Sequence, residues 1–160
     1  MPLIEVSIEV SAPIGVVFDV ARDIGVHQQS QGNHGERAIA GRISGLIEEG
    51  ETVTWEAVHF GVRQRLSSKI VRMVRPTHFR DSMIAGVFQR FDHDHFFEEI
   101  EPGRTRMRDV FDYTAPLGIL GRLADLLFLE RYMRTFLVER GRFIKTTAEL
   151  RMRGPQGSTG

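Results

Sequence analysis

Residues 115–150 of this chain read APLGILGRLADLLFLERYMRTFLVERGRFIKTTAEL. Apolar residues recur in this stretch every three or four positions, which is the spacing of one face of a helix. Pro116 and Gly118 precede the pattern and are typical of a boundary between elements. We therefore predict a long helix that continues to about Leu150, with an apolar face made of Leu120, Leu123, Leu127, Met133, Leu137 and Ile144.

Strand-like alternation fills most of the chain before this helix. Residues 4–10 alternate apolar and polar side chains, as in a strand with one buried face. A short helix is predicted next, up to about Asp23, and residues 27–35 lack an apolar period, which predicts a loop. Short turns with Gly or Pro then separate six further runs, which favours antiparallel hairpins between consecutive strands. These runs are 37–44, 52–60, 63–74, 78–84, 88–100 and 105–114.

This order of elements predicts an α+β fold. A sheet with one apolar side needs a second layer, and the long C-terminal helix can supply it. We expect a seven-stranded curved antiparallel sheet around that helix, with a short helical segment after the first strand. A twisted sheet contacts a straight helix closely at one end and leaves space at the other, so a cavity is expected between them. Gly141 lies within the helix and is interpreted as a point of close contact with the sheet.

Length and composition predict one domain. The chain has 160 residues, of which 41% are hydrophobic and 26% charged, as in ordinary globular proteins. We assign residues 1–150 to this domain and read the last ten residues, RMRGPQGSTG, as a disordered tail. The absence of cysteine excludes disulfides and thiolate zinc sites.

Charge and hydropathy limit the partners. Basic and acidic side chains are equal in number, which argues against nucleic-acid binding. Neither an export signal nor a membrane-spanning stretch is visible, so a cytoplasmic location is expected. The sequence leaves the choice between monomer and homodimer open.

The run from Phe91 to Phe97, FDHDHFF, is the most informative for chemistry. Alternation places His93 and His95 on the same face as the two terminal phenylalanines. On the following run, Met107, Asp109, Phe111 and Tyr113 share a face. A three-residue turn around Pro102-Gly103 would set His95 opposite Asp109 and His93 opposite Phe111.

Three interpretations of these histidines remain open at this point. In the first, they are buried polar residues that hydrogen-bond Asp109 or the backbone, since buried polar groups nearly always have partners. Alternatively, they orient or exchange a proton with a bound carbonyl or hydroxyl, because an imidazole beside a carboxylate can titrate near neutral pH. The third is metal binding, with Asp109 or His59 as a further ligand.

Three motifs, together with the order of elements, resemble the SRPBCC superfamily of START lipid-transfer domains, pollen-allergen-like proteins and polyketide cyclases. The motifs are TWEAVHFGVRQRL from Thr54, GVFQRFDHDHFF from Gly86 and the stretch from Ala115 quoted above. The likeness is to a mostly uncharacterised bacterial subgroup, which often has Trp at the position of Phe91. It implies a helix-grip fold with a ligand cavity, and it implies no single reaction.

From this resemblance and the strand alternation we predict which side chains line the cavity. They are Trp55, His59, Met83, Phe91, His93, His95, Met107, Phe111, Tyr113, Tyr132, Met133 and Phe136. The expected ligand is a small hydrophobic molecule such as a lipid, polyketide, isoprenoid or aromatic metabolite, held by a carrier or sensor without a cofactor or metal.

Two other functions remain open: a cyclase or dehydratase, and an interaction module. The enzyme would use His93, His95 and Asp109 as acid and base, with Tyr113 as a hydroxyl donor. Motifs for nucleotide, phosphate or nucleophilic chemistry are absent from the sequence, which lowers the odds of catalysis.

Charged residues near these positions receive ordinary interpretations. Asp81 is expected to pair with an arginine such as Arg63 or Arg65. The basic residues of the long helix are read as a solvated face, made of Arg131, Arg134, Arg140 and Arg142.

Overall fold

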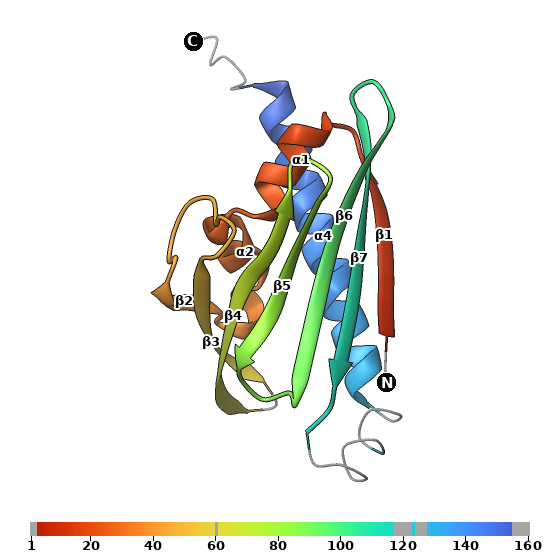
Figure 1. The fold of residues 1–160 in the computed structure, drawn as a ribbon. Helices are drawn as coiled ribbons and strands as arrows, with labels where there is room; N and C mark the ends of the chain where they lie inside the picture. Colours follow the sequence, from red (N-terminus) through yellow and green to blue (C-terminus); the bar gives the residue numbers. More distant parts are fainter. Residues whose placement is uncertain (1–2, 60, 117–122, 124–127, 155–160) are drawn as a thin grey trace, which may run out of the picture.

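The computed structural model describes residues 3–59, 61–116, 123 and 128–154, and Figure 1 shows their arrangement. The strands are β1 Leu3–Val10, β2 Arg37–Gly41, β3 Thr52–His59, β4 Val62–Val74, β5 His78–Ala85, β6 Arg90–Glu101 and β7 Arg104–Thr114. The helices are α1 Ile14–Ala21, α2 Ile24–Ser30, the short 3-10 helix η1 Gly32–His34, and α4 Glu130–Arg153.

The strands form one seven-stranded antiparallel sheet in the order β1-β7-β6-β5-β4-β3-β2. Strands β2 to β7 follow one another as hairpins, and β1 closes the far edge against β7. The long helix α4 crosses one face of this sheet, with α1 and α2 beside its C-terminal half (Figure 1). This is the predicted helix-grip architecture, which the structure confirms.

The register of β6 and β7 at the histidines agrees with the prediction, although the turn is shorter than the predicted three residues. Glu101 pairs with Arg104, and an irregularity between Glu99 and Glu101 compensates for the difference. His95 lies opposite Asp109, and His93 lies opposite Phe111. Because side chains alternate across a strand, this register places both imidazoles and the carboxylate of Asp109 on the face that α4 covers.

Two predictions about the helices are wrong in detail. The segment 27–35, predicted as a loop, begins inside α2 and includes η1. The Asp23 carboxylate caps α2 by accepting hydrogen bonds from the backbone N–H groups of Gly25 and Val26. This helix is too short for its apolar period to be visible in the sequence. At the other end, α4 continues to Arg153, so the first residues assigned to a disordered tail are helical.

The predicted apolar face of the long helix is only partly described. Leu137 and Ile144 are buried, whereas Leu123 is 55% exposed, so its assignment to the buried face is wrong. Leu120 and Leu127 lie outside the described residues. Within the described residues, no helix is both long and apolar enough to cross a membrane.

The core divides into two apolar clusters on the covered face of the sheet. One is built around Phe18 of α1, whose ring meets Phe79 and Phe97 edge-on at centroid distances of 5.6 and 5.3 Å. The other contains Phe111, Tyr113 and Leu137, at the end of the sheet remote from α1. Aromatic packing of this kind adds to the burial of apolar area at each end.

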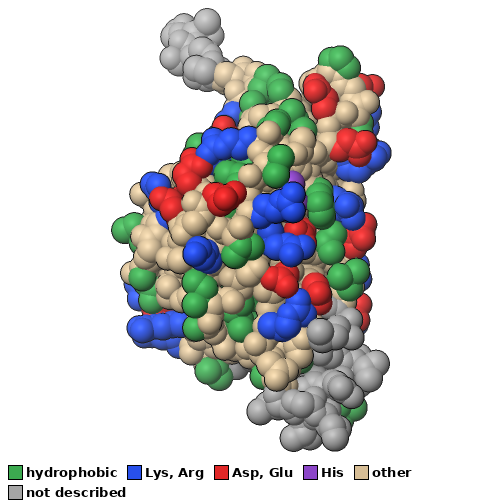
Figure 2. Space-filling view, viewed as in Figure 1, with side chains coloured by type: hydrophobic (Ala, Val, Ile, Leu, Met, Phe, Trp, Pro, Cys, Tyr) green, Lys and Arg blue, Asp and Glu red, His purple; other side chains and the backbone are tan. Residues whose placement is uncertain are grey.

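The outer face of the sheet carries charge pairs. Figure 2 shows acidic and basic side chains intermixed over it, and Arg80 pairs there with Asp94 at 2.7 Å. Arg90 joins Asp92 and Asp112 in the same way. The two faces therefore differ as the alternation predicts, and the cavity must be sought on the covered face.

Gly141 marks the close approach of α4 to the sheet, as expected. A Cβ atom at this position would lie 3.7 Å from both Ile8 Cγ2 on β1 and Met107 Cε on β7, which is ordinary van der Waals contact. A methyl group therefore fits, and a larger side chain does not.

We predict that Gly141→Ala leaves the protein as stable as the wild type or stabilises it by up to about 1 kcal/mol, because alanine removes the helix penalty of glycine. Gly141→Leu is the matched control and should destabilise by about 1 to 3 kcal/mol through overpacking. Denaturant unfolding of both variants measures this. A strongly destabilising Gly141→Ala would mean that the helix lies closer to the sheet than described.

Candidate ligand cavity and its buried ionic cluster

A cavity of about 320 Å³ lies between the sheet, α2 and the N-terminal half of α4. Its size falls within the range of small-molecule sites, roughly 300 to 1,000 Å³. Its wall is mainly apolar and includes most of the side chains predicted from the sequence, namely Trp55, His59, Phe91, His93, His95, Phe111, Tyr132, Met133 and Phe136.

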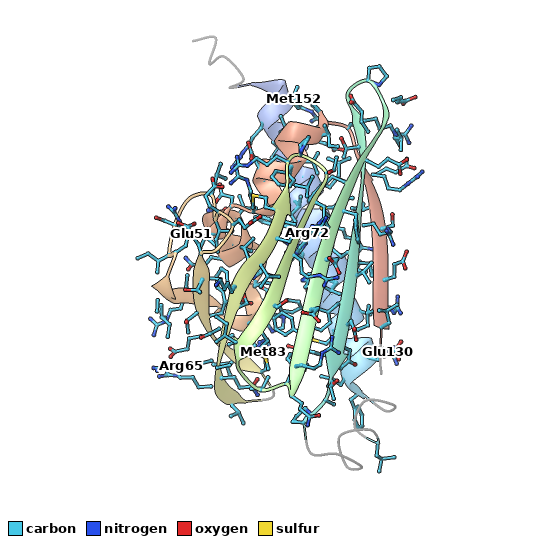
Figure 3. The ribbon with its side chains drawn as sticks, viewed as in Figure 1. Glu51, Arg65, Arg72, Met83, Glu130 and Met152 are labelled. Atoms are coloured by element: carbon cyan, nitrogen blue, oxygen red, sulfur yellow. The ribbon has the colours of Figure 1, made fainter. Side chains whose placement is uncertain are left out.

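Three predicted residues lie elsewhere, and their assignment to the cavity is corrected. Met107 is 1% exposed and packs beneath Gly141, where helix and sheet touch. Tyr113 is fully buried within the apolar cluster that contains Phe111 and is not among the residues of the cavity wall. Met83 packs against the same cluster near the end of β5 remote from α1 (Figure 3). Alternation identifies the face of a strand but not the position along it where the two layers separate.

Sequence reasoning missed several wall residues. His27 of α2 stacks on Trp55 with ring centroids 4.2 Å apart, and its Nε2 lies 3.0 Å from Glu36 Oε1. Both His27 and Glu36 fall in or beside the segment interpreted as a loop. Asp23 as a helix N-cap was the sequence signal that could have revealed α2 and placed His27 on it.

An ionic cluster occupies one wall of the cavity and is assembled from four elements. Strand β5 contributes Asp81, β6 contributes His93 and His95, β7 contributes Asp109, and α4 contributes Arg140. All except Asp81 are buried, and Asp109 is 1% exposed. Asp109 is also the member that does not reach the cavity wall.

Asp109 and Asp81 hold the two imidazoles from opposite sides. His93 Nε2 lies 3.2 Å and His95 Nδ1 2.7 Å from Asp109 Oδ1, although the second contact is not aligned as a hydrogen bond. On the other side, Asp81 Oδ1 lies 2.9 Å from His95 Nε2 and 3.8 Å from His93 Nδ1. The two rings stand 3.8 Å apart, so both acids act on both histidines.

Arg140 completes the cluster from the helix. Its Nη1 lies 3.4 Å from Asp109 Oδ1, and its Nη2 donates a hydrogen bond to the backbone oxygen of Ala21 at 3.1 Å. The guanidinium is 3% exposed, so the prediction that Arg140 belongs to a solvated face is wrong. Arg131, Arg134 and Arg142 are exposed as expected.

The interpretation of Asp81 also requires correction. Its carboxylate bonds His95, whereas Arg65 pairs with Glu56. Asp81 lies directly opposite His93 across the β5–β6 ladder, which brings its side chain into the histidine pair. Pairing between β5 and β6 was the missing information, because the sequence alone did not fix that register.

Burial and ion pairing set the charges in this cluster. Burial alone would raise the pKa of Asp109, but its close contacts with His93 and His95 and the charge of Arg140 hold it well below its usual value. Burial also opposes ionisation of Asp81, yet its pKa is lowered by the hydrogen bond with His95 and by the charge of the imidazoles. Both acids are therefore carboxylates at neutral pH.

The two histidines are shifted in opposite directions. Burial and the positive charge of His95 lower the pKa of His93, against the pull of Asp109 and Asp81. For His95, burial is outweighed by its contacts with Asp109 and Asp81, and its pKa is raised. The cluster thus contains one imidazole that favours the protonated form beside one that favours the neutral form.

A second polar group lies in a different part of the wall. His59 Nδ1 lies 2.5 Å from the Tyr132 hydroxyl, and burial lowers the pKa of His59. Glu36 is 8% exposed, and its Oε2 atom has no hydrogen-bond partner among the described residues. The mainly apolar wall of the cavity therefore includes polar groups both at the ionic cluster and near His59 and Glu36.

Comparison by sequence finds no matching family model and no matching curated protein. Comparison by structure finds many similar folds, among them a protein of Thermus thermophilus with a TM-score of 0.76, 18% identity, and coverage of 94% of this chain and 99% of that chain. The Zhui aromatase/cyclase of a Streptomyces species gives a TM-score of 0.68 at 14% identity and covers 98% of each chain.

A START superfamily protein from Mycobacterium smegmatis aligns with a TM-score of 0.64 at 12% identity, over 94% of this chain and 97% of that chain. These similarities agree with the resemblance of the sequence motifs to the SRPBCC superfamily. At such low identity they establish the helix-grip fold and leave function to be argued from the site.

The ionic cluster leads to a prediction for Arg140. We expect Arg140→Met to destabilise the protein by about 3 to 5 kcal/mol, because it removes the only arginine that contacts Asp109 in the described part of the chain. Arg142→Met, on the exposed side of the same helix, is the matched control and should change stability by less than about 0.5 kcal/mol. Denaturant unfolding measures both, and equal effects would contradict a stabilising role for Arg140.

Proposed function

We propose that this chain binds a small, mostly apolar molecule in the cavity between the sheet and α4, as a carrier or sensor. The observation that carries the proposal is the cavity itself, about 320 Å³ in volume, with a mainly apolar wall that includes some polar groups. Small-molecule sites have this composition: apolar area supplies affinity, and a few polar groups orient the ligand.

The polar groups in the wall indicate which functional groups the ligand carries. Glu36 Oε2, which has no hydrogen-bond partner in the described part of the chain, can accept a hydrogen bond from a ligand hydroxyl or amine. At the ionic cluster, His93, His95 and Asp81 line the cavity. A flat or chain-like hydrophobic molecule with an oxygen function near each of these places fits this wall best.

A second candidate function is a cyclase or dehydratase. The observation that favours it is the pair of adjacent imidazoles of His93 and His95 at the cavity wall, whose pKa values are shifted in opposite directions. An acid and a base side by side can move a proton on a bound carbonyl compound. A His95→Ala variant that keeps its fold and its ligand but loses turnover would support it. Loss of the ligand alone would support the carrier.

Binding can be tested with the intrinsic fluorescence of Trp55, the only tryptophan of the chain and part of the cavity wall. We expect anilinonaphthalene sulfonate to bind saturably and to change the Trp55 emission. Native mass spectrometry of protein purified without detergent should also reveal a co-purifying small molecule. Absence of both signals would contradict the proposal.

A cavity-filling variant locates the binding. We predict that Ala57→Phe, which adds a ring within the cavity, weakens dye binding at least about 10-fold, a loss of about 1.4 kcal/mol. Val58→Phe is the matched control, because Val58 is the next residue of β3 and is 48% exposed on the opposite face. If both variants bind the dye as the wild type does, the dye lies outside the cavity.

A further inference from the structure

We propose that Asp81, His93 and His95 form a binding site for one divalent transition-metal ion in the wall of the cavity. Each residue offers one ligand atom, and the three atoms lie within 4.8 Å of one another. Asp81 Oδ1 stands 2.9 Å from His95 Nε2 and 3.8 Å from His93 Nδ1. Atoms that bind one ion at about 2.0 to 2.2 Å are themselves roughly 3 to 3.5 Å apart, so these side chains are close to coordinating positions.

The hydrogen bonding of the imidazoles supports this assignment. Each ring turns its other nitrogen toward Asp109 Oδ1, at 3.2 Å for His93 Nε2 and 2.7 Å for His95 Nδ1. When those nitrogens carry the protons, the lone pairs of His93 Nδ1 and His95 Nε2 face Asp81. Metal-binding histidines usually have a carboxylate beside the second ring nitrogen. Here the His93 contact is a hydrogen bond, whereas the His95 contact is close but not aligned as one.

Asp109 is therefore a positioning residue in this site and not a ligand. It is almost fully buried, is not among the residues of the cavity wall, and lies 3.4 Å from Arg140 Nη1. A carboxylate that faced the ion would need access to it, whereas one that orients two rings needs to lie on their far side.

The ligand set indicates the kind of metal. Two imidazoles and one carboxylate suit Zn²⁺ or Fe²⁺, whereas Mg²⁺ and Ca²⁺ prefer oxygen ligands alone. The three ligands come from the adjacent strands β5 and β6, so they approach from the sheet side. All three residues line the cavity, so a molecule bound there could complete the coordination of an ion that they hold.

Charge then predicts the chemical class of the cavity ligand, a step that rests on the proposed function. The two carboxylates and the guanidinium of Arg140 together carry one net negative charge. A divalent ion bound by two neutral imidazoles would leave one excess positive charge in a buried wall. An anionic oxygen on the ligand, such as a carboxylate, phenolate or enolate, would compensate it.

The test uses untagged protein stripped with a chelator and titrated with Co²⁺ and Zn²⁺. We expect one ion per chain and visible Co²⁺ absorption bands of a low-symmetry site. Asp81→Ala, His93→Ala and His95→Ala should each weaken binding more than 10-fold, and Asp109→Asn about 10- to 100-fold. No saturable binding by the wild-type protein, or binding unchanged in His95→Ala, would overturn the proposal.

Two histidine controls lie outside the site. His59→Ala removes another cavity imidazole, and His78→Ala removes one that pairs with Asp94 on the outer face of the sheet. Neither should change the Co²⁺ affinity, and loss of binding in His78→Ala instead would overturn the assignment. If a triad variant does not fold, paramagnetic shifts of the His93 and His95 ring protons in the wild-type Co²⁺ protein decide the question.

Dye binding by the metal-free protein separates this proposal from the proposed function. If the protein binds the dye but not Co²⁺, the metal site is overturned and the cavity proposal stands. If it binds Co²⁺ but not the dye, only the cavity proposal is overturned. For the anionic class, naphthoate should gain at least about 10-fold in affinity on Zn²⁺ loading, about 1.4 kcal/mol, and its neutral methyl ester should not. Equal gains in affinity for naphthoate and its methyl ester would overturn the assignment of an anionic ligand.

Discussion

The buried carboxylate of Asp109 is the constraint on which the rest of this structure depends. An ionised acid taken out of water costs several kcal/mol unless hydrogen bonds and opposite charges compensate it. Here the compensation comes from β6 through His93 and His95 and from α4 through Arg140. The register of β6 and β7 and the rotation of α4 are thereby linked, because a slip of one residue in β6 would turn both imidazoles to the outer face.

The same constraint explains where the cavity lies. Arg140 reaches Asp109 because the next residue, Gly141, lets α4 approach β1 and β7 closely. Where α4 approaches the sheet closely, Met107 fills the space between helix and sheet, and α1 covers the sheet with the aromatic cluster around Phe18. Toward the N-terminal half of α4 the contact is looser, and the cavity opens between the helix and β3 to β6. Close packing on one side of the ionic cluster and free space on the other follow from a straight helix on a twisted sheet.

Much of the fold and part of the candidate site could be predicted from the sequence. The rest of the site depends on contacts between elements that are distant in the sequence. The pairing of His95 with Asp109 follows from strand alternation and a short turn, which are local properties. The partner of Asp81 depends on how β5 and β6 pair, and the sequence did not determine that register. Arg140 was grouped with its neighbours on the helix because nothing local distinguishes a buried arginine from an exposed one. Met107 shows the limit of alternation, since its face is correct but its position along β7 places it under the helix.

An ionic cluster of this kind is a poor way to stabilise a core. Buried ion pairs can often be replaced by apolar side chains of similar volume with no loss of stability, so stability alone does not explain five ionisable groups beside an apolar cavity. Their layering suggests a different purpose. Asp81, His93, His95 and Arg140 face the cavity, while Asp109 lies behind them and fixes the orientation of the rings. A front layer that can contact a ligand or an ion, held by a back layer that cannot, is the arrangement of a preorganised site.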